Sequence, residues 1–100
     1  MSWWEVITLV MLDLGSGKVA DILGHPLLQA RIRRSDNRNP RAAVWAHIQM
    51  HTKQECKHVA YSKRYEPLLF EKSEKSVWSI DKKAAQAEVP ELVGKLRDFN

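Results

Sequence analysis

Four potential metal ligands lie close together in the middle of the chain. His47, His51, Cys56 and His58 fall within twelve residues, and imidazole and thiolate are the groups that bind zinc in proteins. If the segment is one helix, the three histidines share a face, whereas Cys56 falls on the opposite, apolar face. One helix therefore cannot close a four-ligand shell. The simpler interpretation is a solvent-facing stripe of histidines with a buried cysteine, and we predict neither a metal nor a cofactor.

The motifs that catalysis would need are incomplete. The segment 15–18 (Gly-Ser-Gly-Lys) resembles the end of a phosphate-binding loop, but Leu12 and Val19 stand where the first glycine and the magnesium-binding hydroxyl should be. A helix-breaking turn is the simpler interpretation of this segment. Cys56 lies in no recognisable nucleophile motif, and the carboxylates show no acid–base spacing. We therefore expect a protein that is not an enzyme.

Positive charge is the strongest chemical feature of the chain. The net charge is +4, and the segment 31–64 alone contains nine Lys or Arg against two carboxylates. Charge concentrated in this way is informative about partners rather than about fold. Arginine, tryptophan and tyrosine also concentrate binding energy at protein interfaces. The sequence therefore predicts a partner-binding surface made of Arg31, Arg33, Arg34, Arg38 and Arg41, with Trp3, Trp4, Tyr65 and Pro67 as anchors.

The segment 18–34 offers an alternative, because it resembles a helix-turn-helix. Ala20 and Gly24 have the spacing of the first helix and turn, and an arginine-rich helix follows. The pattern departs from the motif at Pro26, which follows the turn at once, and at Ala30, where Ile or Val is usual. The arginines also lie at the C-terminal end of the second helix, whereas base-reading residues usually lie near its start. Direct DNA binding through the 31–41 arginines is therefore the second hypothesis.

The elements that must position these residues are mostly helical. Ser2 and Glu5 have capping-box spacing before a helix over 3–13, which is apolar on nearly every face and so belongs to the core or to an interface. Ser16 is expected to cap a helix over 18–23, and Pro26 begins another through 32. Asn39 and Pro40 precede the segment 41–60, whose pattern favours a helix but also allows a strand.

The C-terminal part of the chain contains two segments of different character. The residues 68–70 and 77–78 could form two short strands. Asp81 is expected to cap a helix over 82–88, and Pro90 opens a final amphipathic helix. The predicted fold is mainly α, a small single domain over 1–100, and the sequence also allows a short two-stranded β-ribbon within 65–79.

Composition and the N-terminal sequence narrow the cellular compartment in which we expect the protein. One cysteine excludes an intramolecular disulfide, and the apolar run at the N-terminus is far shorter than the roughly 20 residues that a membrane span needs. The N-terminus also lacks the basic region and the cleavage site of a secretion signal. We therefore expect a cytoplasmic protein without a membrane partner.

The chain as a whole resembles the lambdoid-phage anti-RecBCD accessory proteins. The resemblance rests on the length, on the sequence Ser2-Trp3-Trp4-Glu5, on the cluster Arg31–Arg41 and on the loop Tyr65-Glu66-Pro67. It implies a non-enzymatic modulator in the host cytoplasm that contacts a protein subunit of the host recombination nuclease. With the basic charge, this resemblance implies a protein that inhibits or redirects a nucleic-acid-processing complex, with nucleic acid as a secondary partner.

Overall fold

The N-terminal helix α1 (Trp3–Leu14) lies at the centre of the fold. In this computed structural model, which describes residues 2–53, 67–73 and 75–99, the stretch Val6–Leu12 is buried without interruption. The predicted capping box is confirmed, since the Ser2 amide donates to Glu5 Oε1 over 3.1 Å and the Glu5 amide donates to Ser2 Oγ over 3.4 Å. Gly15 ends the helix with φ +79°, a conformation that glycine adopts most readily.

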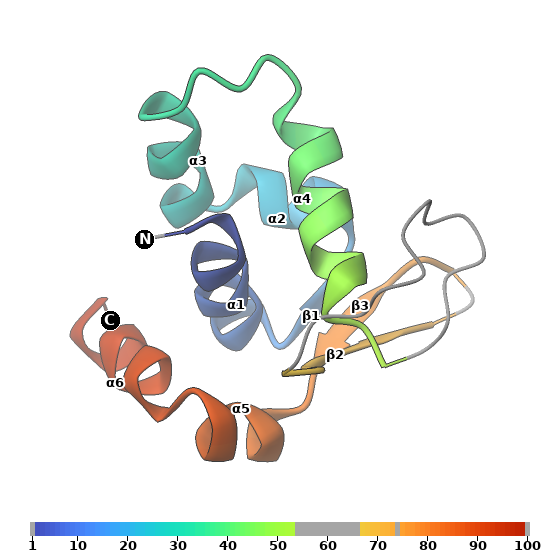
Figure 1. Cartoon of the computed structure of the whole chain (residues 1–100), viewed down its shortest axis with the longest axis vertical. Coiled ribbons are helices and arrows are strands. Elements are labelled where there is room, and N and C mark those ends of the chain that lie inside the picture. The colour runs from blue at the N-terminus through green and yellow to red at the C-terminus, as the bar shows by residue number, and fades with distance from the viewer. Residues whose placement is uncertain (1, 54–66, 74, 100) are drawn as a thin grey trace.

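Five further helices pack around α1. The helices α2 (Val19–Gly24), α3 (Pro26–Arg33) and α4 (Pro40–Met50) lie on one side, and α5 (Lys82–Glu88) with α6 (Pro90–Phe99) lies on the other (Figure 1). The predicted helices over 26–32, 82–88 and after Pro90 are confirmed, as are the caps Asn39 and Asp81. The predicted Ser16 cap is wrong. Asp21 replaces it by accepting a hydrogen bond from the Lys18 amide over 2.9 Å.

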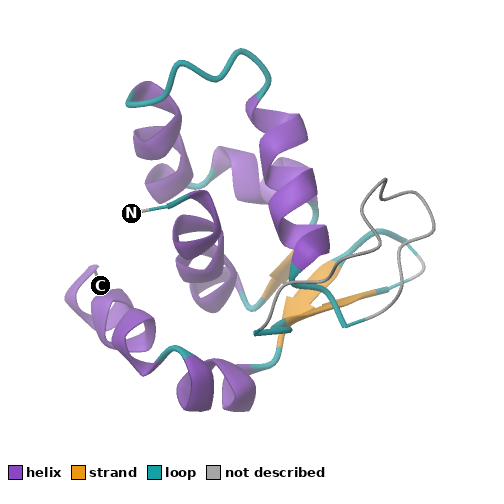
Figure 2. Cartoon of the chain, viewed as in Figure 1, coloured by secondary structure: helices purple, strands orange, loops and turns teal. Residues whose placement is uncertain are grey.

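A small antiparallel sheet closes one end of α1. Its order is β1 (Ser16–Gly17), β3 (Trp78–Ile80) and β2 (Phe70–Lys72), with Gly17 opposite Trp78 and Phe70 opposite Ile80 (Figure 2). The prediction of paired short strands within 65–79 is confirmed in kind, although β3 extends to Ile80. The strand β1 was missed, because a two-residue strand in a Gly-Ser-Gly turn leaves no periodic signal.

Helix α4 resolves part of the ambiguity over 41–60. The strand interpretation is wrong for residues 41–50, which are helical. A helix continuing past Met50 is also wrong as far as Lys53, because Thr52 forms a parallel bridge with Phe70 and the Lys53 amide donates to the Phe70 carbonyl over 2.8 Å. The rest of that predicted helix, residues 54–60, lies outside the described residues.

The mainly α fold class is confirmed, and the described elements share one apolar core. Ile7, Val10, Ile48 and Leu28 are fully buried in it, so α1, α3 and α4 each contribute side chains. Of the helices that the structure describes, none is both long enough and apolar enough to cross a lipid bilayer. The α3–α4 connection contributes no residue to this core, so the arginines of the connection lie at the periphery of the fold.

Candidate partner-binding surface

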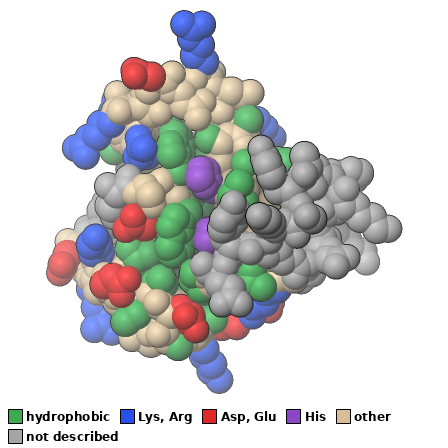
Figure 3. All heavy atoms as spheres, in the orientation of Figure 1, with side chains coloured by type: hydrophobic (Ala, Val, Ile, Leu, Met, Phe, Trp, Pro, Cys, Tyr) green, Lys and Arg blue, Asp and Glu red, His purple; other side chains and the backbone are tan. Residues whose placement is uncertain are grey.

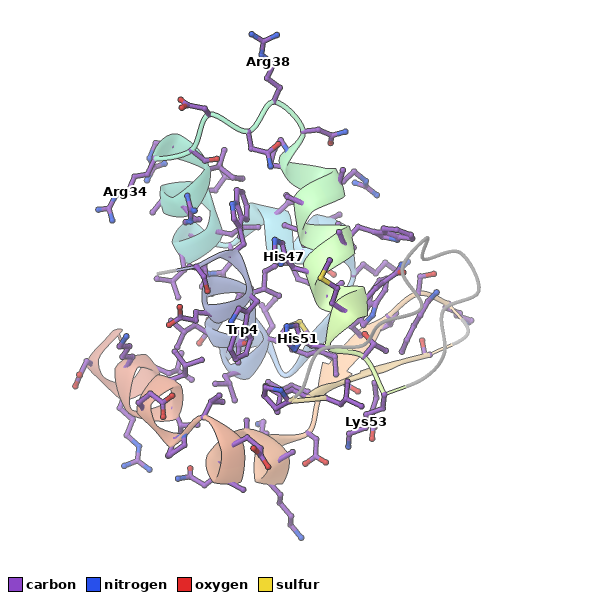
Figure 4. All side chains as sticks on the ribbon, viewed as in Figure 1. Trp4, Arg34, Arg38, His47, His51 and Lys53 are labelled. Carbon is purple, nitrogen blue, oxygen red and sulfur yellow. The ribbon has the colours of Figure 1, made fainter. Side chains whose placement is uncertain are left out.

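Four arginines surround the connection between α3 and α4. Arg33, Arg34, Arg38 and Arg41 are exposed, and we call this group the basic end. Arg34 and Arg38 point away from the body of the protein in Figure 4, and Figure 3 shows basic side chains projecting at the same end of the molecule. The structure thus brings together four of the five arginines that the sequence predicted.

Side-chain to backbone hydrogen bonds shape the connection that carries these arginines. The Asn37 amide donates to Ser35 Oγ over 3.0 Å, and the Asn39 amide donates to Asn37 Oδ1 over 2.8 Å. The Asn39 side chain in turn caps α4 by accepting from the Ala42 amide over 3.1 Å. Successive turns of this kind fix a loop without a regular element, so the basic end is presented in a defined shape.

The charge of the basic end is not neutralised within the described part of the chain. The ion pairs there join His25 to Asp13 and Lys53 to Glu71 and Asp81, and none of them includes an arginine of the basic end. The nearest carboxylate in sequence, Asp36, is exposed and forms no ion pair among these residues. Exposed guanidinium groups without an internal partner are free to pair with carboxylates or phosphates of another molecule.

Arg31, the fifth predicted arginine, lies in a different environment. Its side chain is half-buried, and its guanidinium carbon lies 4.9 Å from the centroid of the Trp3 ring. Its Nε is buried and has no hydrogen-bond partner among the described residues. The guanidinium and the Trp3 ring form a cation–π contact between α3 and α1. Arg31 and Trp3 therefore already serve the packing of these two helices.

Trp4 forms a similar contact with the end of α4. Its ring stacks on His51 with centroids 4.8 Å apart and planes inclined by 21°. His51 is only 6% exposed, and its Nδ1 must donate to the Pro67 carbonyl, 2.9 Å away, because a carbonyl oxygen only accepts. Figure 4 shows Trp4 and His51 side by side. The predicted solvent-facing histidine stripe is therefore wrong at His51. Pro67, a predicted anchor, is partly buried, and its carbonyl oxygen is engaged by this ring.

His47 lies one turn before His51 and is half-buried on the same side of α4. Burial lowers the pKa of His47 from its ordinary value, and the nearby His51 lowers it further. Within the ranges 2–53, 67–73 and 75–99, no three His, Cys, Asp or Glu side chains gather closely enough to hold a metal ion. The other two potential ligands, Cys56 and His58, and the predicted anchor Tyr65 lie outside the described residues.

The structure contains an Asp–His pair that the sequence analysis missed. His25 Nε2 lies 2.7 Å from Asp13 Oδ2, while His25 Nδ1 accepts a hydrogen bond from the Leu27 amide over 3.1 Å. Both ring nitrogens are thus engaged, so the ring has no nitrogen left to act as a general base on a substrate. His25 is instead the N-cap of α3. The available signal was Pro26, which favours the first helical position and so makes residue 25 the cap.

The polar side chains at the start of α3, where a helix-turn-helix would read bases, already form hydrogen bonds within the protein. His25 is buried in its contacts with Asp13 and Leu27, and Leu28 is fully buried. Gln29 donates its amide to the Leu23 carbonyl. The exposed arginines Arg33 and Arg34 lie in the last turn and at the end of the helix. This arrangement suits contact with charge better than contact with base edges.

Trp45 is a second residue that sequence reasoning missed. Its spacing of three residues from Ile48 is typical of one apolar helix face, yet Ile48 is fully buried and Trp45 is 38% exposed. The two residues are three apart, which turns them about 60° away from each other around a helix axis. Neither composition nor spacing tells which edge of an apolar face remains in solvent.

Comparisons of this chain with protein-family models, with curated proteins and with solved structures gave no match. We therefore argue function from the placement and the chemistry of the described side chains.

Proposed function

We propose that this protein is a non-enzymatic modulator that binds a protein of a cytoplasmic nucleic-acid-processing complex, such as a recombination nuclease, and inhibits or redirects it. The basic end docks on an acidic surface of that partner. The observation that supports this proposal is the exposure of Arg33, Arg34, Arg38 and Arg41 without ion pairs in the described part of the chain.

The energetics of arginine favour such a contact. A guanidinium group can bond a carboxylate through two parallel hydrogen bonds, and these bonds strengthen when the partner excludes water. Truncation of one member of a desolvated interfacial charge pair costs about 2–5 kcal/mol. The α3–α4 connection is already ordered by Ser35, Asn37 and Asn39, so docking loses less conformational entropy than a flexible loop would.

A capture experiment with two matched variants tests the proposal. The first variant replaces the four arginines of the basic end by serine. The second removes the same charge elsewhere, at Lys82, Lys83, Lys95 and Arg97, which are exposed on α5 and α6. We expect a nuclease-treated bacterial lysate to yield one protein that wild type and the α5–α6 variant retain and the basic-end variant loses. Binding and inhibition are then reconstituted with that protein in purified form.

The capture experiment can also contradict the proposal. If both variants lost the partner equally, the net charge of the protein, and not the basic end, would explain the interaction. A partner retained by the basic-end variant would place the binding surface elsewhere.

Salt dependence separates this proposal from direct DNA binding by the same arginines. Binding to duplex phosphates weakens by about 0.9 log units per log unit of salt for each neutralised phosphate. We expect purified protein to bind a duplex oligonucleotide weakly at physiological salt. If the protein bound the duplex tightly under these conditions and the basic-end variant did not, the partner of the basic end would be DNA and not a protein.

A further inference from the structure

Trp45 differs from the other described aromatic residues in its exposure. It is 38% exposed, whereas Trp78 is 2% exposed and Phe70 is fully buried. Trp3 and Trp4 are half-buried and stacked against Arg31 and His51. An indole left in water exposes apolar surface that burial against a partner would remove, with a gain of about 25 cal/mol per Å². Trp45 is therefore the described aromatic side chain with most to gain from a partner.

Trp45 belongs to the same surface as part of the basic end. It follows Arg41 by one turn of α4, and residues four apart are neighbours on a helix surface. Arg38 lies just before the Asn39 cap of the same helix. The core side of α4 is formed by Val44 and Ile48, which are fully buried. The N-terminal half of α4 thus carries an indole and cationic groups outside the core.

We propose that Arg38, Arg41 and Trp45 bind an acidic amphipathic segment of the partner protein, and we call these three residues the α4 surface. The apolar side of that segment covers the Trp45 indole, while its carboxylates pair with Arg38 and Arg41. Arginine and tryptophan are the residue types that most often dominate the energy of protein interfaces. This inference rests on the proposed function and assigns the chemistry of its binding site.

A single-stranded nucleic acid fits these residues less well. Proteins that bind single strands stack successive bases on several aromatic side chains along a charged groove. Of the aromatic side chains whose burial the structure describes, Trp45 is the only exposed one. One indole with nearby guanidinium groups better fits an acidic peptide, which offers an apolar side chain together with carboxylates.

A displayed library of 16-residue peptides tests the inference. All positions of each peptide are random. We expect selection on wild-type protein to enrich acidic sequences with apolar residues at helical spacing, and we measure their affinity by fluorescence polarisation. Trp45→Ala should weaken binding by at least about 30-fold, and Trp45→Phe should recover part of that loss. Arg38→Ser with Arg41→Ser should weaken binding as well.

Two controls match these changes. Leu14, which is 39% exposed, is the other large apolar side chain that the described residues leave in solvent, so Leu14→Ala should not change the affinity. Lys82→Ser with Lys83→Ser removes equal charge from α5 and should have little effect. On wild-type protein, the indole N–H resonance of Trp45 should shift more than those of Trp3, Trp4 and Trp78 on peptide addition, a readout that needs no variant.

Several results would overturn the inference. One is failure to select acidic peptides, and another is a peptide that binds Trp45→Ala as tightly as wild type. If such a peptide still required the arginines, the proposed function would stand and only the role of Trp45 would fall. Binding of a 20-nucleotide oligo-dT at physiological salt, lost in Trp45→Ala, would assign the α4 surface to single-stranded nucleic acid instead.

Discussion

The α4 surface and the N-terminal cluster (Trp3, Trp4, Arg31 and His51) are built from similar residues and differ in their surroundings. In the N-terminal cluster, the Trp3 ring is covered by Arg31 of α3. The Trp4 ring is covered by His51, the C-cap of α4. At the α4 surface, Trp45 is exposed, and Arg38 and Arg41 form no ion pair within the described part of the chain. The same chemistry thus stabilises the fold in one region and remains unused in the other.

This difference shows that residue type alone does not identify a binding residue. Arg31 and Arg33 are two positions apart, yet Arg31 packs on Trp3 and Arg33 is exposed. On a helix, residues two apart point about 160° away from each other. A basic cluster that is continuous in sequence is therefore divided by helix geometry into a packing residue and exposed residues.

The largest effect that we expect from this comparison is the difference in stability between variants of Trp4 and Trp45. We expect Trp4→Ala to lower the free energy of unfolding by about 2–3 kcal/mol, because it removes a large side chain packed against the core and the His51 ring. Trp45→Ala should change it by less than about 1 kcal/mol, since Trp45 is exposed and lies outside the core cluster. Urea denaturation of both variants measures these values, and equal losses would contradict the distinction between the two regions.

The sequence predicts those features of the fold that depend on neighbours in the chain. The capping box of Ser2 and Glu5, the Asn39 cap and the Asp81 cap are local arrangements with a known spacing, and all three are confirmed. The strand β1 and the His51–Trp4 stack depend on contacts between distant segments. No local pattern encodes such contacts, so they could not be predicted.

The same limit applies to the candidate surface. The cluster of arginines was visible in the sequence, because charge is a property of composition. The separation of Arg31 from the basic end and the exposure of Trp45 both depend on which helix faces pack against α1 and α2. Periodicity identifies an apolar face but does not locate its solvent edge.

The His25 cap provides the next test, because it joins the end of α1 to the start of the helix that leads to the basic end. His25→Ala removes both the bond to Asp13 and the bond from the Leu27 amide. We expect a loss of about 1–2 kcal/mol in the free energy of unfolding, the usual cost of an N-cap.

A double-mutant cycle with Asp13→Asn measures the part of this loss that belongs to the His25–Asp13 pair. If His25→Ala left stability unchanged, the cap would be an arrangement without energetic consequence.

Arg31 and Arg34 provide a smaller test of the same comparison. Arg31→Ala should lower the free energy of unfolding by about 1 kcal/mol, because it removes the cation–π contact with Trp3 and the packing of the arginine stem. Arg34→Ala should stay within about 0.5 kcal/mol, since its side chain is exposed. Partner binding should show the reverse order, with the larger loss at Arg34. Parallel behaviour of the two variants in both assays would remove the division between packing and binding arginines.

The smallest effect expected is the pH dependence that His47 adds to stability. Burial and the neighbouring His51 hold the pKa of His47 below its ordinary value of 6.5, so the folded protein favours the neutral ring. The unfolded chain therefore takes up a proton first as the pH falls, and the stability contributed by neutral His47 is present above pH 6.5 and lost below it. The carboxylates with lowered pKa, Glu5 and Asp81, have ordinary values of 4.5 and 3.8 and titrate at lower pH.

The window between pH 7.5 and 5.5 thus separates His47 from these carboxylates, with those pH values chosen to bracket the ordinary pKa of roughly 6.5. We expect the urea midpoint of wild type to fall across this window and that of His47→Gln to fall less, because the variant has no ring to protonate at this position. Every other titratable side chain is common to the two proteins, so the difference between them reports on His47. If both proteins lost stability in parallel, the pKa of His47 would be the same in the folded protein and in the unfolded chain. The His47 side of α4 would then face solvent, as the α4 surface does, and would not be packed as the N-terminal cluster is.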